Sequence, residues 1–136
     1  MIPMKSRSES AILASVAGKV IFRKGAESQV MGSVIQGISN ALYEVQVLDR
    51  NVGTMLNDNL ESYKLIGPKD MPHIEPVLWT HGQTGVRGIG EPPIVATSGA
   101  VACAVFNAIG RPVRDLPMTP DRILKAMDGP VIGGVA

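Results

Sequence analysis

The sequence has few of the residues on which several common functions depend. Its single cysteine, Cys103, excludes an internal disulfide and an iron–sulfur cluster held by this chain alone. Because Cys103 lies among alanines, we expect it to be a small buried side chain. Two Phe, two Tyr and one Trp, with a net charge of +1 and no basic stripe, give little support to nucleic-acid binding. His73 and His81 do not have the spacing of a common zinc site.

Long apolar runs are also missing. The alanine-rich stretch near residue 100 is interrupted by Thr97, Ser98 and Asn107. A membrane-spanning helix needs roughly 20 apolar residues, so we expect no contact with a membrane. Polar residues at positions 8–10 interrupt the start of any apolar segment after the first basic residues, so a secretory signal is not expected either.

Glycine and proline, in contrast, are abundant. The 15 glycines and 10 prolines make up about a fifth of the 136 residues, and they cluster at 82–93, 110–120 and 129–134. These clusters separate segments with helical periodicity, which is typical of loops rather than of a low-complexity tract. With 45% hydrophobic and 18% charged residues, the composition is that of a globular domain. We predict an α+β fold in which glycine-rich loops and helices pack on a small sheet.

Apolar residues recur at every fourth position over residues 29–43 and predict a helix. They are Val30, Val34, Ile38 and Leu42, and Ser28 is the expected N-cap. Gly32 and Gly37 lie inside this helix, where each costs about 1 kcal/mol relative to alanine. Either close packing against another element or the close approach of a ligand would explain them.

The remaining elements follow from shorter patterns. We expect a short helix over residues 10–17, a strand over 19–22, a strand over 44–48 followed by a hairpin turn at 49–53, and a strand over 74–80. Pro92-Pro93 opens a helix that Gly110 ends, and a row of alanines at 96, 100, 104 and 108 predicts close packing along it. Thr119 and Pro120 begin a last helix that stops at Gly129.

The glycine-rich stretch 85–90 has neither the dinucleotide-binding fingerprint nor a P-loop lysine. Glu91, which follows it, is the more informative residue. Gly88 and Gly90 leave backbone amides uncovered, and the apolar neighbours Ile89 and Pro92 would reduce the hydration of the carboxylate. Glu91 is therefore a candidate general base, although a glutamate at a helix start is also a common helix-end charge.

Several short segments, which occur along the chain in the same order as in the family, resemble the C-terminal end of the molybdenum-binding subunit of the xanthine dehydrogenase/aldehyde oxidase family. They are Gly85–Pro93, Asn107–Gly110, Leu116–Pro120, Ser28–Gly32, Gln36–Ile38, Ala41–Glu44, Asn59–Lys64 and Asp70–Pro72. The resemblance is closest to the bacterial aldehyde oxidoreductases. It covers about residues 25–127, and its strength comes from the order of many short matches.

The resemblance implies a role for five residues. Glu91 matches the glutamate beside molybdenum that takes a proton from a metal-bound hydroxyl, so that the oxygen of water is added to an aldehyde or an N-heterocycle. Gly88, Ile89 and Gly90 match the backbone next to the metal's ligands, and Gln29 matches a glutamine that binds the molybdopterin cofactor. Iron–sulfur clusters and FAD on partner chains would carry the electrons away.

The same resemblance implies that much of the active site lies elsewhere, because subunits of this family are several times longer. Residues 1–24 match poorly, with Phe22-Arg23 where an Asn-Pro-like turn is expected, and residues 25–136 correspond to a C-terminal portion of the molybdopterin-binding domain. We therefore expect the chain to need the rest of the molybdenum subunit and the iron–sulfur and flavin subunits, and to be inactive alone. The alternative is a non-catalytic fragment that folds or self-associates without cofactor. A cytoplasmic location is expected, or a periplasmic one by export with a partner.

Overall fold

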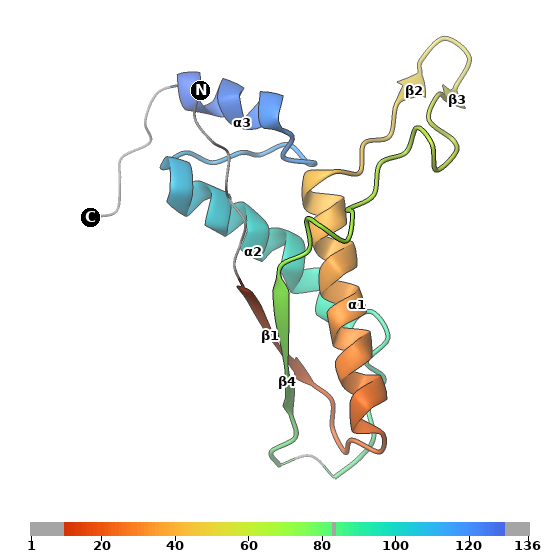
Figure 1. Cartoon of the computed structure of the whole chain (residues 1–136), viewed down its shortest axis with the longest axis vertical. Helices are drawn as coiled ribbons and strands as arrows, with labels where there is room; N and C mark the ends of the chain where they lie inside the picture. The colour runs from red at the N-terminus through yellow and green to blue at the C-terminus, as the bar shows by residue number, and fades with distance from the viewer. Residues whose placement is uncertain (1–9, 83, 130–136) are drawn as a thin grey trace. The chain divides into compact units, whose positions relative to one another are not determined.

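The computed structural model describes residues 10–82 and 84–129, which form three helices and two small two-stranded sheets (Figure 1). In chain order the elements are β1 (Ser10–Val16), α1 (Arg23–Leu42), β2 (Leu48–Asp49), β3 (Thr54–Met55), β4 (His73–Trp79), α2 (Pro92–Ile109) and α3 (Pro120–Asp128). This mixture confirms the predicted α+β class. The chain divides into a first unit, Met1–Gln36 with Gly67–Val95, and a second unit, Gly37–Ile66 with Ala96–Ala136.

The sheet of the first unit consists of two parallel strands. β1 pairs with β4 over seven positions, from Ser10 opposite His73 to Val16 opposite Trp79. β4 confirms the strand predicted over residues 74–80, and it tolerates Pro76 because both strands of a two-stranded sheet are edges. The helix predicted over residues 10–17 is wrong, since β1 occupies this segment. Ser10 and His73 are 63 positions apart, so the pairing that decides the conformation is invisible to local pattern.

Helix α1 gives the first unit most of its buried apolar surface. Ala26, Val30 and Val34 on one face of α1 are buried, as are Ala17 after β1 and Ile74 on β4. Ala26, Val30 and Val34 follow one another at every fourth position, so their side chains lie in one row, as predicted for this helix.

The start of α1 differs from the prediction. The helix begins at Arg23 and not after Ser28, because the backbone N–H of Ala26 already donates to the carbonyl of Phe22 at 3.1 Å. In the first turn, Arg23 Nε donates to Glu27 Oε1 at 2.7 Å. The strand predicted over residues 19–22 does not form, since these residues lead directly into the helix.

The second unit packs the end of α1 against parts of α2 and the segment before α3. Its buried apolar residues are Ile38, Ala41, Ile66 and Met118. A Cβ added at Gly37 would lie 2.5 Å from Thr97 Cβ on α2, and Ser98 Oγ donates to the Gly37 carbonyl at 3.2 Å. Close packing, one of the two explanations for the helical glycines, is therefore confirmed at Gly37. Gly32 has no such neighbour, since an added Cβ there would meet nothing within 4 Å.

A short antiparallel hairpin, β2–β3, extends from the second unit (Figure 1). The turn predicted at residues 49–53 is confirmed, but the strand predicted over 44–48 includes only Leu48. Asn57 holds the base of the hairpin, because its Oδ1 accepts from the Val47 N–H at 2.9 Å and its Nδ2 donates to the Val45 carbonyl at 2.6 Å. The side chain of Asn57 thus takes hydrogen bonds that a longer strand would have made with backbone.

The predicted ends of α2 and α3 are confirmed. Gly110 adopts a φ of 69° after α2, and its N–H donates to the Phe106 carbonyl at 2.7 Å. Thr119 and Pro120 begin α3, and Gly129 follows its last residue. A hydrogen bond from Thr119 lowers the pKa of Asp121 in the first turn.

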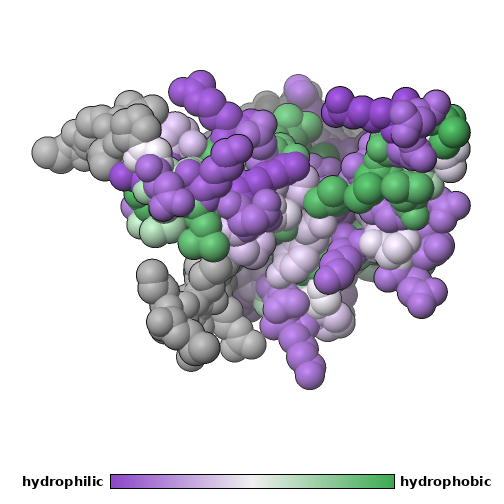
Figure 2. All heavy atoms as spheres, turned by 90° about the horizontal axis from the view of Figure 1, so that it is seen from above, coloured by the Kyte–Doolittle hydropathy of each residue, from purple (hydrophilic) through white to green (hydrophobic). Residues whose placement is uncertain are grey.

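The outer surface of α2 differs most from expectation. The four alanines of its predicted packing row are exposed, and so is Cys103, so the burial predicted for that thiol is wrong. Only 11% of the helix is buried, and by length and composition alone its 18 residues are long and apolar enough to cross a membrane. The expectation that no segment is long enough for this is therefore corrected for the described part of the chain. Figure 2 shows apolar side chains on the surface beside hydrophilic ones.

Candidate functional site

The glycine-rich stretch 85–90 is anchored to the end of β1 within the first unit. The backbone N–H of Lys19 donates to the Gly85 carbonyl at 2.8 Å, and Gly18 and Val86 form an isolated antiparallel bridge. Gly18 has a φ of 64°, and a Cβ at this position would lie only 2.3 Å from the Gly85 carbonyl oxygen. Only glycine fits both the left-handed backbone and this close approach.

A second anchor lies at the other end of the stretch, where Gly90 meets α1. Gln29 Nε2 donates to the Gly90 carbonyl at 2.8 Å, and Ser33 Oγ lies 3.2 Å from the same oxygen. Gln29 and Gly90 are 61 positions apart in the sequence. Two of the predicted site residues, one on the helix and one on the loop, are therefore in direct contact.

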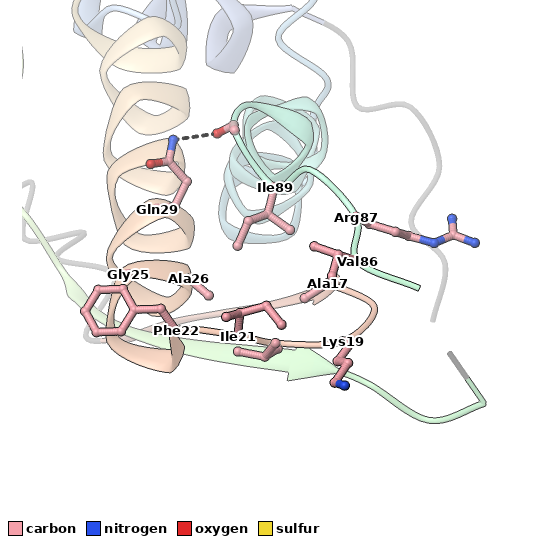
Figure 3. Close-up of a pocket in the computed structure, with 12 residues that line it drawn as sticks. Ala17, Lys19, Ile21, Phe22, Gly25, Ala26, Gln29, Val86, Arg87 and Ile89 are labelled. Atoms are coloured by element: carbon pink, nitrogen blue, oxygen red, sulfur yellow. Dashed lines mark hydrogen bonds between the residues drawn. The ribbon is translucent and has the colours of Figure 1, made fainter. Parts of the chain in front are cut away.

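A pocket of about 430 Å³ lies beside this contact, entirely within the first unit. Three of the five predicted site residues line it, namely Gln29, Ile89 and Gly90. Figure 3 shows the side chains of Val86 and Ile89 facing those of Ile21 and Ala26, while Arg87 extends away from the pocket. The pocket thus has mainly apolar walls, with the Gln29 amide as a polar group at its edge.

Phe22 also lines this pocket, at the position where an Asn-Pro-like turn was expected. Its ring lies against the first turn of α1, because a Cβ added at Gly25 would approach Phe22 Cδ1 to 2.5 Å. The ring is nevertheless 69% exposed. Phe22 in place of the expected turn therefore forms part of the pocket wall, and α1 still begins normally at Arg23.

Gly88 and Gly90 have no reason within the described residues to be glycine. Neither has a positive φ, and a Cβ added at either would meet nothing within 4 Å. Glycine at such a position leaves the backbone open to close approach by a group outside this chain. A cofactor would fit here, with the Gly88–Gly90 backbone and the amide oxygen of Gln29 as the groups that contact it.

Glu91 does not line the pocket and lies immediately beyond it, at the start of α2. Its side chain is exposed, and the described residues supply no hydrogen bond or ion pair to the carboxylate. The reduced hydration expected from Ile89 and Pro92 is therefore not provided by these residues. Pro93, just inside the helix, is buried and fixes the backbone on which Glu91 stands.

Sequence reasoning missed the residues that depend on long-range contacts. Ser33 is only 4% exposed and reaches Gly90, and the basic residues Lys19 and Arg87 are among those that line the pocket, although the Arg87 side chain extends away from it. A serine within a helix and two isolated basic residues carry no local signal of such a role. In residues 10–82 and 84–129, no group of three or more His, Cys, Asp or Glu side chains forms a metal site.

A second pocket, of about 410 Å³, lies in the second unit. Polar side chains line much of it, including Glu44, Tyr63 and Arg122. Tyr63 Oη donates to Glu44 Oε2 at 2.8 Å, and Arg122 donates to the Pro117 carbonyl at 2.9 Å. None of the predicted site residues lies here, and these side chains hold local structure.

Comparison with known proteins identifies the family. A model of the molybdopterin cofactor-binding domain matches residues 5–72, which include Gln29 and end before Glu91. The xanthine dehydrogenase molybdenum-binding subunit of Escherichia coli is 35% identical over 102 residues, covering 72% of this chain and 14% of that protein. The aldehyde oxidoreductase molybdenum-binding subunit of the same species is 33% identical over 113 residues, covering 79% of this chain and 15% of that protein.

Solved structures agree with these relatives. The aldehyde oxidoreductase of Desulfovibrio desulfuricans superposes with a TM-score of 0.76 at 26% identity, over 88% of this chain and 13% of that one. Quinoline 2-oxidoreductase of Pseudomonas putida shares the fold, with a TM-score of 0.72 at 24% identity, over 89% of this chain and 16% of that one. The chain thus spans about one-seventh of the length of the relatives it matches. It belongs to the molybdopterin cofactor-binding domain family of the molybdenum subunits of xanthine dehydrogenases and aldehyde oxidoreductases.

Proposed function

We propose that this chain forms part of the catalytic centre of a molybdenum hydroxylase, which oxidises an aldehyde or an N-heterocycle with oxygen derived from water. The observation that supports this most directly is the contact between Gln29 and Gly90 at the edge of a pocket, one residue before Glu91. It gathers a candidate cofactor ligand, a backbone open to close approach and a carboxylate in one place.

The cofactor that fits this arrangement is molybdopterin. Gln29 uses one N–H of its amide for Gly90, which leaves its oxygen and second N–H for a ligand. Gly88 and Gly90 add no side chain to the space beside them, so a ligand reaches their backbone. When bound, the cofactor supplies the redox chemistry, since it accepts the two electrons released by the substrate carbon.

Glu91 acts in this proposal as the general base. Its carboxylate takes the proton of the oxygen nucleophile as the carbon–oxygen bond forms. The anchors at Gly85 and Gly90 hold the loop that carries it, and Pro92 and Pro93 stiffen the backbone that follows. Burial of the carboxylate, which the described residues do not provide, comes from the remainder of the subunit.

Because the chain spans about one-seventh of its relatives, the proposal requires partners. The remainder of the molybdenum subunit supplies most cofactor and substrate contacts, and iron–sulfur and flavin subunits accept the electrons. We propose that the complex is cytoplasmic, with a periplasmic location as the alternative.

Replacement of the proposed base tests the mechanism. In the molybdenum-containing complex that holds this chain, Glu91→Gln should lower kcat on the order of 100-fold or more, because the amide accepts no proton at neutral pH. Glu75→Gln is the matched control, since Glu75 is an exposed glutamate on β4 away from the pocket. Near-native turnover of the Glu91→Gln enzyme would contradict the assignment of the base.

Replacement of Gly90 tests the cofactor contact without relying on activity. Gly90→Ala places a methyl group in open space, so the free energy of unfolding should change by less than about 0.5 kcal/mol. The molybdenum content of the complex should nevertheless fall, because the methyl group occupies the space proposed for the cofactor. Gly99→Ala, which also meets nothing within 4 Å but lies on α2 outside the pocket, should retain molybdenum. Equal molybdenum content in both variants would contradict the placement of the cofactor beside Gly90.

The alternative function is a non-catalytic module that folds and associates without cofactor. The exposed apolar surface of α2 favours it. Elemental analysis of the chain purified from its native host separates the two. Stoichiometric molybdenum in a larger complex supports the hydroxylase, and a metal-free preparation supports the module.

A further inference from the structure

The carbonyl oxygen of Gly90 has two hydrogen-bond donors on α1. Gln29 Nε2 lies 2.8 Å from it and Ser33 Oγ lies 3.2 Å from it. Ser33 has a second acceptor on its own helix, because its Oγ also lies 2.9 Å from the Gln29 carbonyl oxygen. A serine hydroxyl has a single proton, so Ser33 donates to only one of these oxygens at a time.

The two donors differ in exposure. Gln29 is exposed and lines the pocket, so a ligand reaches its amide. Ser33 is 4% exposed and is not among the residues that line the pocket, so a ligand does not compete for its hydroxyl. One donor to Gly90 is therefore open to competition and the other is protected from it.

The orientation of the Gly90 carbonyl matters for the next residue. The peptide unit is planar, so the hydrogen bonds that hold this oxygen also fix the direction of the Glu91 backbone N–H. Gly90 itself has no side chain and no neighbour within 4 Å of a Cβ, so side-chain packing does not hold this peptide. Its position depends on the donors from α1.

We propose that Ser33 is a positioning residue that holds the Gly90–Glu91 peptide when the exposed Gln29 amide turns to meet a bound cofactor and, in turning, gives up the hydrogen bond that it makes to Gly90 in the cofactor-free chain. The Ser33 proton then moves from the Gln29 carbonyl to the Gly90 carbonyl by rotation of the hydroxyl, and the loop stays in place. This inference rests on the proposed function, because it is the cofactor that draws Gln29 away.

The cofactor-free chain gives the first test, through the carbonyl carbon shift of Gly90 measured by NMR. Because either donor suffices, Ser33→Ala and Gln29→Ala should each shift this signal little, and the double variant should shift it by more than the sum of the two. Additive shifts would overturn the proposed redundancy of the donors. Ser28→Ala is the matched control, an exposed serine on the same helix.

The molybdenum-containing complex gives the second test, with kcat expressed per bound molybdenum. Ser33→Ala should lower kcat on the order of 10-fold while KM and metal content stay within about twofold, because the lost bond orients Glu91 and does not bind substrate. Ser33→Thr, which retains the hydroxyl, should restore kcat.

Three results would overturn the role of Ser33: an unchanged kcat in Ser33→Ala, a loss explained wholly by lower metal content, or an equal loss in Ser33→Thr. Glu91→Gln, measured alongside, separates the two proposals. If Glu91→Gln abolishes turnover and Ser33→Ala has no effect, only the inference on Ser33 fails. If Glu91→Gln also has no effect, the proposed function fails with it.

Discussion

At the scale of single residues, hydrogen bonds with polar side chains fix three points of the irregular backbone. The Gly90 carbonyl is held by Gln29, the base of the hairpin by Asn57, and the backbone N–H of Ile66 by Ser39 Oγ at 3.1 Å. Net contributions of about 0.5–1.5 kcal/mol each are typical of such bonds, but a lost partner leaves a backbone group unsatisfied and costs more. Substitution of these polar residues is therefore expected to destabilise the fold, as substitution of residues in the apolar core does.

The pair Tyr63–Glu44 gives a pH-dependent prediction. A hydrogen bond to the Glu44 carboxylate raises the pKa of Tyr63 above its usual value of 10.0. The neutral phenol is the favoured form in the folded chain, so its contribution to stability is present below pH 10 and is lost as pH rises through the raised pKa. Ultraviolet titration of the phenolate in a Tyr43→Phe background measures the midpoint, and Glu44→Gln should bring it back towards 10. An unchanged midpoint in Glu44→Gln would show that the carboxylate is not the cause.

Part of the site could be predicted at this scale and part could not. Gln29, Ile89 and Gly90 were identified through family resemblance, and the structure brings them to one pocket. Reduced hydration of the Glu91 carboxylate was predicted from its apolar neighbours in sequence, yet their side chains leave Glu91 exposed. Ser33 was not predicted, because its contact with Gly90 spans 57 positions and no local pattern encodes it.

At the scale of elements, the two glycines of α1 have different explanations and so predict opposite effects. Gly37→Ala should destabilise the fold by about 1–3 kcal/mol, because the new methyl group would overlap Thr97 on α2. Gly32→Ala should stabilise it by about 0.5–1 kcal/mol, since alanine is the better helix former and the space there is open. Urea unfolding of both variants measures these free energies.

Each glycine is the control for the other, since both lie on the same helix. Equal destabilisation by the two alanines would show that close packing at Thr97 is not the reason for Gly37.

The elements also show which patterns in sequence are reliable. The helix ends at Gly110 and Thr119 and the apolar row that contains Val30 and Val34 were predicted well, whereas the N-cap of α1 was not. These signals arise from contacts within one or two turns. β1 was predicted as a helix because its stabilising partner, β4, is remote in sequence. The alanine row of α2 was read as a packing surface, but the described residues do not cover it.

At the scale of the whole molecule, the exposed apolar surface predicts association of the isolated chain. Val95 on α2 is 81% exposed, and Leu60 and Val52 on the second unit are 80% and 71% exposed. Apolar surface left in water favours self-association, so light scattering at micromolar concentrations should give a mass that rises with concentration. Val95→Glu should reduce the effect, with Lys125→Gln on α3 as the control that changes the net charge by the same amount at an exposed position. A concentration-independent monomer would show that these side chains do not drive association.

The anchoring of the 85–90 stretch to the end of β1 has a consequence for how the chain folds. The bridge from Gly18 to Val86 closes a loop of 68 positions, and β1 and β4 pair across a similar separation. Contacts between such distant residues carry a high loop-closure entropy and form after local structure. Helix α1 is local and able to form early, whereas the pocket is complete only when residues 85–90 have been synthesised and have returned to the end of β1. Under the proposed function, the cofactor therefore enters after this loop has closed, when the strands and the helix that frame the pocket are already paired.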